Sequence, residues 1–171
     1  MGRLMGMALI MIGCAGVLGC WNRRERLRQA LQEEWIRLFA GFEYAVLQEH
    51  VRLYEFFSCY ETKFPQMKKF LMDVCDAMQT FQEPSGISIW MTQLQKHKNA
   101  LLADAKTWEI LTAAAEAFYA DTGAENIRSM QVCRKRMEQC LATQRKEYAK
   151  KQRVYAPVGM MAGIIVIILL V

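Results

Sequence analysis

Residues 158–171 read Val-Gly-Met-Met-Ala-Gly-Ile-Ile-Val-Ile-Ile-Leu-Leu-Val and contain no charged side chain. An aliphatic run of this kind at a chain end is hard to bury in a small globule, so it favours a membrane helix over a buried core helix. The run alone covers ~21 Å as a helix, whereas the hydrocarbon core of a bilayer is ~30 Å thick. The predicted span therefore extends back to residue 154 and covers ~27 Å. Pro157 falls near its start, where membrane helices tolerate proline.

The other end of the chain is also apolar. Residues 4–20 would cover ~26 Å as a helix, which makes a short span. Trp21 and Tyr155 stand where aromatic side chains usually meet the membrane surface. Gly159 and Gly163 lie within the second apolar segment. We therefore predict transmembrane helices at 1–20 and 154–171, with a polar domain over 21–153 between them.

Basic residues set the expected orientation. They follow the first apolar segment and precede the second, and the members that set topology are Arg23, Arg24, Arg26, Arg28, Lys146, Lys150, Lys151 and Arg153. Because positive charge is retained in the cytoplasm, the middle domain is expected there, next to membrane lipid, with both termini outside. The alternative is a signal peptide over 3–20, since 17–20 read Val-Leu-Gly-Cys and loosely resemble a lipoprotein cleavage box.

The middle segment has the length of one domain. It holds all 17 acidic residues and all but one of the 22 basic ones, which gives a net charge of +4. That balance is mild and shows no basic face away from the predicted membrane surface, so we expect no nucleic-acid partner. The six cysteines form no CxxC pair and no metal-ligand spacing, and they are interpreted as small apolar side chains in a reducing compartment.

The whole middle segment reads as helix. From Leu27 to Val46, apolar residues recur at intervals of three and four, and no proline separates this stripe from the first apolar segment. Further helices are expected at about 51–62, 65–81, 87–102 and 105–120. A sixth begins near residue 124 and has no breaker before Pro157. The predicted fold is all-α: a six-helix cytoplasmic bundle whose first and last helices continue into the two transmembrane helices.

Local signals position these helices. Phe64-Pro65 interrupts the chain, because the residue before proline disfavours helix. Residues 83–86, Glu-Pro-Ser-Gly, form a turn by composition, and Asp104 is the expected N-cap of the fifth helix. The largest apolar side chains should face inward: Trp35, Phe42, Phe70, Trp90 and Trp108.

The sequence does not favour an enzyme. His50 and His97 are far apart, and neither belongs to a recognisable acid and nucleophile pattern. No HExxH, GxSxG or phosphate-binding loop occurs, so we expect no catalytic residue, no metal, no cofactor and no small-molecule substrate. A polar face of the last helix is instead the candidate partner surface, formed by Arg134, Lys135, Glu138 and Arg145.

The arrangement resembles the stage III sporulation protein AB family over the whole chain. The start of the first cytoplasmic helix, Leu27-Arg28-Gln29-Ala30-Leu31, is similar to that family's arginine-rich helix. The end is closer: residues 150–155, Lys-Lys-Gln-Arg-Val-Tyr, then Gly159, Gly163 and the aliphatic tail resemble its basic stretch, tyrosine, spaced glycines and apolar run. Residues 108–111, Trp-Glu-Ile-Leu, and Glu125-Asn126 also fall where the family has similar segments.

The sequence departs from the family pattern at two places. Residues 44–51 lack the turn with glycine and proline that the family often has, and Phe118-Tyr119 replaces a Leu-Gly pair. The resemblance implies a cytoplasmic helical domain similar to the type II secretion platform protein. It also implies a place in the mother-cell membrane facing the forespore, in a sporulation-specific channel complex. A secretion-type ATPase and other membrane components of that complex are the implied partners.

Two alternatives remain open. One is a general platform-like protein of a type II secretion or type IV pilus system. The other is a membrane-anchored helical sensor, or a small enzyme with a site between the helices. A secretion ATPase encoded immediately upstream would favour the sporulation platform.

Overall fold

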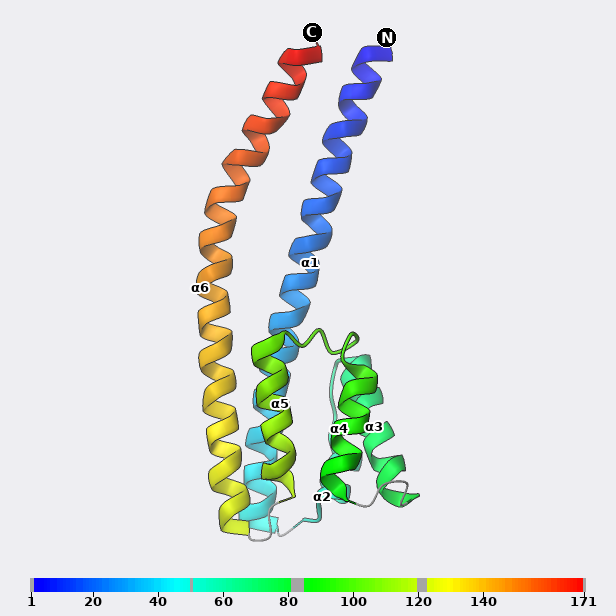
Figure 1. Cartoon of the computed structure of the whole chain (residues 1–171), viewed down its shortest axis with the longest axis vertical. Coiled ribbons are helices and arrows are strands. Elements are labelled where there is room, and N and C mark those ends of the chain that lie inside the picture. Colours follow the sequence, from blue (N-terminus) through cyan, green and yellow to red (C-terminus); the bar gives the residue numbers. More distant parts are fainter. Residues whose placement is uncertain (1, 50, 81–84, 120–122, 171) are drawn as a thin grey trace. The chain divides into compact units, whose positions relative to one another are not determined.

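The computed structural model describes residues 2–49, 51–80, 85–119 and 123–170, although most side chains of 2–18 and all those of 48, 49, 123, 124 and 152–170 lie outside the description. Within these ranges the chain is entirely helical, with no strand (Figure 1). The elements are α1 (Gly2–Tyr44), the π-helical turn η1 (Ala45–Glu49), α2 (Leu53–Cys59), α3 (Pro65–Gln79), α4 (Gly86–His97), α5 (Ala105–Phe118) and α6 (Gly123–Leu170). The all-α prediction with six α-helices is therefore confirmed.

The chain divides into two compact units. One consists of Arg28–Leu141, and we call it the bundle unit; the other combines Met1–Leu27 with Ala142–Val171, and we call it the terminal unit. Helices α1 and α6 each run without interruption through both units, as the lack of breakers predicts. The predicted domain boundaries at residues 20 and 153 remain predictions.

The helices of the bundle unit begin where local chemistry supports a helix start. The Asp104 carboxylate accepts a hydrogen bond from the Thr107 N–H at 2.9 Å, which confirms it as the N-cap of α5. Ser85 caps α4 in the same way through the N–H of Ser88. Pro65 occupies the first turn of α3, where its missing N–H removes no helical hydrogen bond.

The core of the bundle unit is aromatic. Trp35 and Trp90 are almost fully buried and meet edge to face, and the Trp90 ring also packs on Phe70 and Phe118. The Trp90 indole N–H donates to the Leu111 carbonyl oxygen at 2.9 Å, so its one polar atom is satisfied. These rings join α1, α3, α4 and α5 into one core.

Four of the five side chains predicted to face inward are buried. The exception is Trp108, which is half-buried and lies beneath the Lys98 ammonium group, with Nζ 4.7 Å from the ring centroid. A cation over an indole face is favourable at a partly exposed site, so the ring remains near the surface. Its position on an apolar stripe did not reveal this pairing.

Two local features differ from the sequence-based expectation. Helix α4 ends at His97 rather than near residue 102, and the chain turns through Leu102, whose φ of 52° is left-handed. Leu101 is buried beside this turn, and its N–H donates to the His97 carbonyl oxygen at 3.0 Å. Burial of Leu101 therefore favours the turn over continued helix. The turn η1 was also not expected, because no glycine or proline marks it.

The terminal unit brings together two aromatic residues from opposite ends of the chain. The rings of Trp21 on α1 and Tyr148 on α6 lie 5.8 Å apart, and the Tyr148 hydroxyl donates to Asn22 Oδ1 at 2.8 Å. Most side chains of the two predicted spans, including Tyr155 and Pro157, lie outside the described residues. Among those that are described, no helix is both long and apolar enough to cross a membrane.

Candidate functional site

The predicted partner surface on α6 is divided between the two units. Arg134, Lys135 and Glu138 belong to the bundle unit, whereas Arg145 belongs to the terminal unit. Lys135, Glu138 and Arg145 are exposed. Arg134 is half-buried, because its guanidinium group is engaged inside the molecule.

Arg134 joins the last helix to the first. Its Nε lies 2.9 Å from Glu43 Oε1, its Nη2 lies 3.4 Å from Glu43 Oε2, and its Nη1 lies 3.3 Å from Glu138 Oε1. The hydrogen bond with Glu43 is the main cause that raises the pKa of Arg134. A fork of this kind has favourable geometry for an arginine and carboxylate pair. Arg134 therefore has a structural role, and Lys135 and Glu138 are the better probes of partner binding.

A second polar contact holds α2 against α1. The Tyr60 hydroxyl donates to Glu34 Oε1 at 3.3 Å, and Arg37 Nη1 donates to Glu34 Oε2 at the same distance. Burial, followed by the negative charge of Glu34, raises the pKa of Tyr60. Tyr60 therefore stays protonated and acts as a hydrogen-bond donor to a buried carboxylate.

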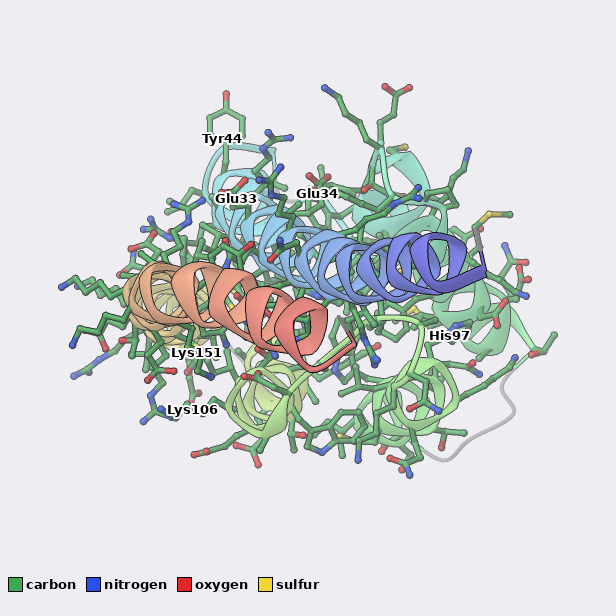
Figure 2. The ribbon with its side chains drawn as sticks, turned by 90° about the horizontal axis from the view of Figure 1, so that it is seen from above. Glu33, Glu34, Tyr44, His97, Lys106 and Lys151 are labelled. Atoms are coloured by element: carbon green, nitrogen blue, oxygen red, sulfur yellow. The ribbon has the colours of Figure 1, made fainter. Side chains whose placement is uncertain are left out.

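His97 lies at the end of α4 and pairs with α3 (Figure 2). Its Nε2 is 2.9 Å from Asp73 Oδ2, and the Lys96 ammonium group lies 2.8 Å from the same oxygen. The hydrogen bond from Lys96, and then that from His97, lowers the pKa of Asp73. The buried imidazole packs edge-on against Phe70. His97 is therefore a buried, hydrogen-bonded residue that links α4 to α3.

The described residues offer no metal centre: no group of three or more His, Cys, Asp or Glu side chains converges among them. Cys75, Cys133 and Cys140 are buried, whereas Cys20 and Cys59 are exposed. Burial raises the pKa of the Cys75 thiol to about 11. Cys75 therefore remains a protonated, poorly reactive thiol near neutral pH.

Sequence reasoning missed an open groove between η1 and α2. It has a volume of about 610 Å³ and is lined by Ala45, Val51, Glu55, Phe56, Cys59, Tyr60 and Glu61. Beside Ala45 in the chain, Tyr44 and Leu47 are 60% and 54% exposed, and the Tyr44 side chain points away from the helices (Figure 2). Large exposed apolar groups beside a groove are typical of protein contact surfaces. The available sequence signal was that Tyr44 and Leu47 do not belong to the apolar stripe that runs from Leu27 to Val46.

The topology-setting residues are mostly exposed where they are described. Arg23, Arg24 and Arg26 on α1, and Lys146, Lys150 and Lys151 on α6, are exposed, and Arg28 is half-buried. Trp21 is 40% exposed and contacts Tyr148, a partner that the sequence did not identify. Arg153, Tyr155, Pro157, Gly159 and Gly163 have side-chain positions outside the description.

Over the described residues the protein is all-helical, with one compact bundle unit and a terminal unit, and α1 and α6 contribute to both. The model of the stage III sporulation protein AB family matches residues 3–171. The chain therefore belongs to the stage III sporulation protein AB family, as the resemblance indicated. Comparison with curated proteins found no match, and comparison with solved structures found none either.

Proposed function

We propose that this protein is a membrane-anchored platform of a sporulation-specific, secretion-like channel complex, and that it docks a secretion-type ATPase at the membrane. The observation that carries the proposal is the continuity of α1 and α6, each of which runs from the bundle unit to its own end of the chain. Family membership over residues 3–171 supports the sporulation context.

Anchoring is supported by the composition of the chain ends. The apolar segments 4–20 and 154–171 are each flanked on the bundle side by basic residues, which favours a cytoplasmic bundle. In the proposed arrangement the protein lies in the mother-cell membrane facing the forespore. The bundle then stands at the inner surface of that membrane, where a cytoplasmic ATPase would be accessible.

Docking is supported by two surfaces of the bundle unit. One is the polar face of α6 with Lys135 and Glu138, and the other is the groove between η1 and α2 with Tyr44 and Leu47 beside it. The first offers exposed charge, and the second offers exposed apolar area. A platform of this kind binds through surface complementarity and needs no catalytic group.

The test is co-isolation of the ATPase with the tagged full-length chain from sporulating cells. The α6 variant carries Lys135→Glu, Glu138→Lys and Arg145→Glu. A matched control on α3 carries Lys68→Glu, Asp76→Lys and Lys69→Glu, which change exposed residues and give the same net charge change. We expect the α6 variant to recover less ATPase than the control, with a difference that shrinks at high salt because exposed charges are screened over ~8 Å.

The groove is tested in parallel by Tyr44→Ser with Leu47→Ser, against the exposed pair Met72→Ser with Ile87→Ser. Loss of ATPase with the α6 variant or the groove variant, but not with its control, supports docking and identifies the surface. If wild-type protein recovers no ATPase, or if all four variants recover as much as wild type, the docking proposal is wrong. If His97→Ala abolished sporulation in a folded protein, a sensory or enzymatic function would replace it.

A further inference from the structure

The contact between Trp21 and Tyr148 fixes how the two helices of the terminal unit are aligned. Asn22 accepts the Tyr148 hydroxyl hydrogen bond, so these two residues lie at the same level along the helices. The helices are antiparallel within this unit (Figure 1). A position one residue later on α1 is therefore level with a position one residue earlier on α6. By this alignment, Arg24 falls near the level of Lys146 and Cys20 near the level of Lys150.

This alignment gathers exposed cations into one narrow band. The members are Arg23, Arg24, Arg26, Lys146, Lys150 and Lys151, and we call them the cation band. On α6 the band extends ~7.5 Å along the helix axis from Lys146 to Lys151, and Arg26 on α1 lengthens the whole band to ~10.5 Å. The head-group layer on one side of a bilayer is ~5–8 Å thick. The acidic residues at the same level are Glu25 and Glu147, so the band has a clear excess of positive charge.

The ends of the two apolar segments that are nearest the bundle unit lie at different levels relative to this band. The segment on α1 ends at Cys20, which is level with Lys150, whereas the segment on α6 begins only at Val154. Lys150 and Lys151 therefore lie at the depth of Cys20, the last residue of the first apolar segment. A lysine at that depth places its ammonium group among lipid phosphates by extending its flexible stem.

The aromatic pair lies at the level of the cation band. Trp21 is 40% exposed and its ring contacts that of Tyr148 at a tilt, while Asn22 accepts the hydrogen bond of the Tyr148 hydroxyl. An indole of this kind is suited to the boundary between head groups and hydrocarbon. If the chain is anchored as proposed, this ring pair and the cations near its level lie at the membrane surface together.

We infer that the cation band is a binding surface for anionic phospholipid head groups of the cytoplasmic leaflet. The inference rests on the membrane anchoring of the proposed function. Each Lys or Arg near an anionic surface strengthens binding about fivefold, so removing three should weaken selection of anionic lipid strongly. The aromatic pair keeps the two halves of the band at one level.

The test uses the full chain reconstituted in vesicles of phosphatidylcholine and phosphatidylglycerol in equal amounts. The protein is extracted in mild detergent, and the two lipids that remain bound are quantified. We expect phosphatidylglycerol to exceed phosphatidylcholine severalfold, and we expect high salt to remove the excess. Glycerol phosphate added in solution should not displace it, because the surface recognises head groups presented by a bilayer.

The variant Arg24→Gln with Lys146→Gln and Lys150→Gln should return the bound lipids to near the vesicle ratio. The matched control, Lys63→Gln with Lys68→Gln and Lys69→Gln, removes three exposed lysines from the bundle unit and should keep the excess. Equal loss in both variants, no excess in wild type, or displacement by glycerol phosphate would overturn the inference.

Resistance of wild-type protein to alkaline extraction from the same vesicles is measured separately. If the protein resists extraction but shows no lipid selection, the proposed anchoring stands and only the inference about lipid binding is wrong. A wild-type protein that alkali removes contradicts the anchoring itself.

Discussion

Trp90 occupies the centre of the bundle unit, where it contacts aromatic side chains that are far apart in the sequence. The ring meets Phe57 from α2, Phe70 from α3 and Phe118 from α5. Periodicity predicted that Phe70 and Trp90 face inward, and both are buried. It did not predict which rings meet, because that depends on how separate helices are placed.

Removing the Trp90 ring should destabilise the fold substantially. Trp90→Ala deletes a fully buried side chain and a hydrogen bond to the Leu111 carbonyl oxygen, at a cost of about 3–5 kcal/mol. For a chain of this size, that cost should lower the melting temperature of the full-length protein in detergent by roughly 10 °C. Met72→Ala, at a 55% exposed position, should change it little. An unchanged melting temperature for Trp90→Ala would show that the ring is not in the core.

Asp73 should make stability depend on pH in acid. Lys96 and then His97 lower its folded-state pKa, so the ionised carboxylate stabilises the fold above its unfolded pKa of about 4. This contribution is lost as the pH falls through the lowered folded-state pKa. Urea denaturation of wild type and Asp73→Asn should therefore differ by up to about 1 kcal/mol near neutral pH, a modest value because Lys96 is largely exposed.

The same comparison in acid provides the check on Asp73. As the pH falls through the lowered folded-state pKa of Asp73, the difference between wild type and Asp73→Asn should shrink, because the carboxylate becomes protonated. Asp76→Asn removes an exposed carboxylate from the same helix and serves as the matched control. A difference that grows as the pH falls would have the wrong sign and would contradict the assigned pairing.

Helix boundaries show which elements local sequence determines and which depend on tertiary packing. Asp104, Ser85 and Pro65 mark helix starts through their own chemistry, and those starts were predicted within about a residue or two. The end of α4 was placed too late, because burial of Leu101 in the following turn is a tertiary effect. The turn η1, and with it the groove toward α2, carried no local signal.

The ring of Tyr119 lies so close to Gly86, the first residue of α4, that a side chain at this position would meet it. A Cβ atom added at Gly86 would overlap ring carbons Cδ1 and Cε1 of Tyr119, which follows α5. Gly86→Ala should therefore cost about 1–3 kcal/mol, measured by thermal unfolding of the full-length protein. The cost should largely disappear in a Tyr119→Ala background, which gives a coupling energy of at least about 1 kcal/mol.

Gly41→Ala on α1 is the control for Gly86→Ala. A Cβ atom there would lie 3.5 Å from the Phe56 ring, which is an ordinary contact, and alanine favours helix over glycine by about 1 kcal/mol. Gly41→Ala should thus be neutral or stabilising. Equal costs for Gly86→Ala with and without Tyr119 would show that the close approach does not restrict this position.

At the scale of the whole molecule, the sequence predicted an all-helical chain whose first and last helices continue to the chain ends. The first 64 residues contain no proline, and none lies between residue 124 and Pro157, so nothing local interrupts either long helix over those stretches. The contacts of the candidate site could not be predicted from the sequence to the same extent. Arg134 on the predicted partner face pairs with Glu43, a residue far away in sequence, so its structural role emerged only from tertiary packing.

In the proposed function, both ends anchor the chain in the membrane and hold the bundle on the cytoplasmic side. Cys59 is a natural probe of this claim, because it is exposed, whereas Cys75 is buried and its pKa is raised to about 11. The full-length variant Cys14→Ala with Cys20→Ala removes the two thiols that lie in the first apolar segment.

The decisive measurement is labelling of that variant with a membrane-impermeant maleimide, in intact cells and after permeabilisation. A second variant, with a cysteine added after Val171 and Cys59→Ser, reports the opposite side. We predict that Cys59 is labelled only after permeabilisation and that the terminal cysteine is labelled in intact cells. Labelling of Cys59 in intact cells would place the bundle outside the membrane and contradict the account.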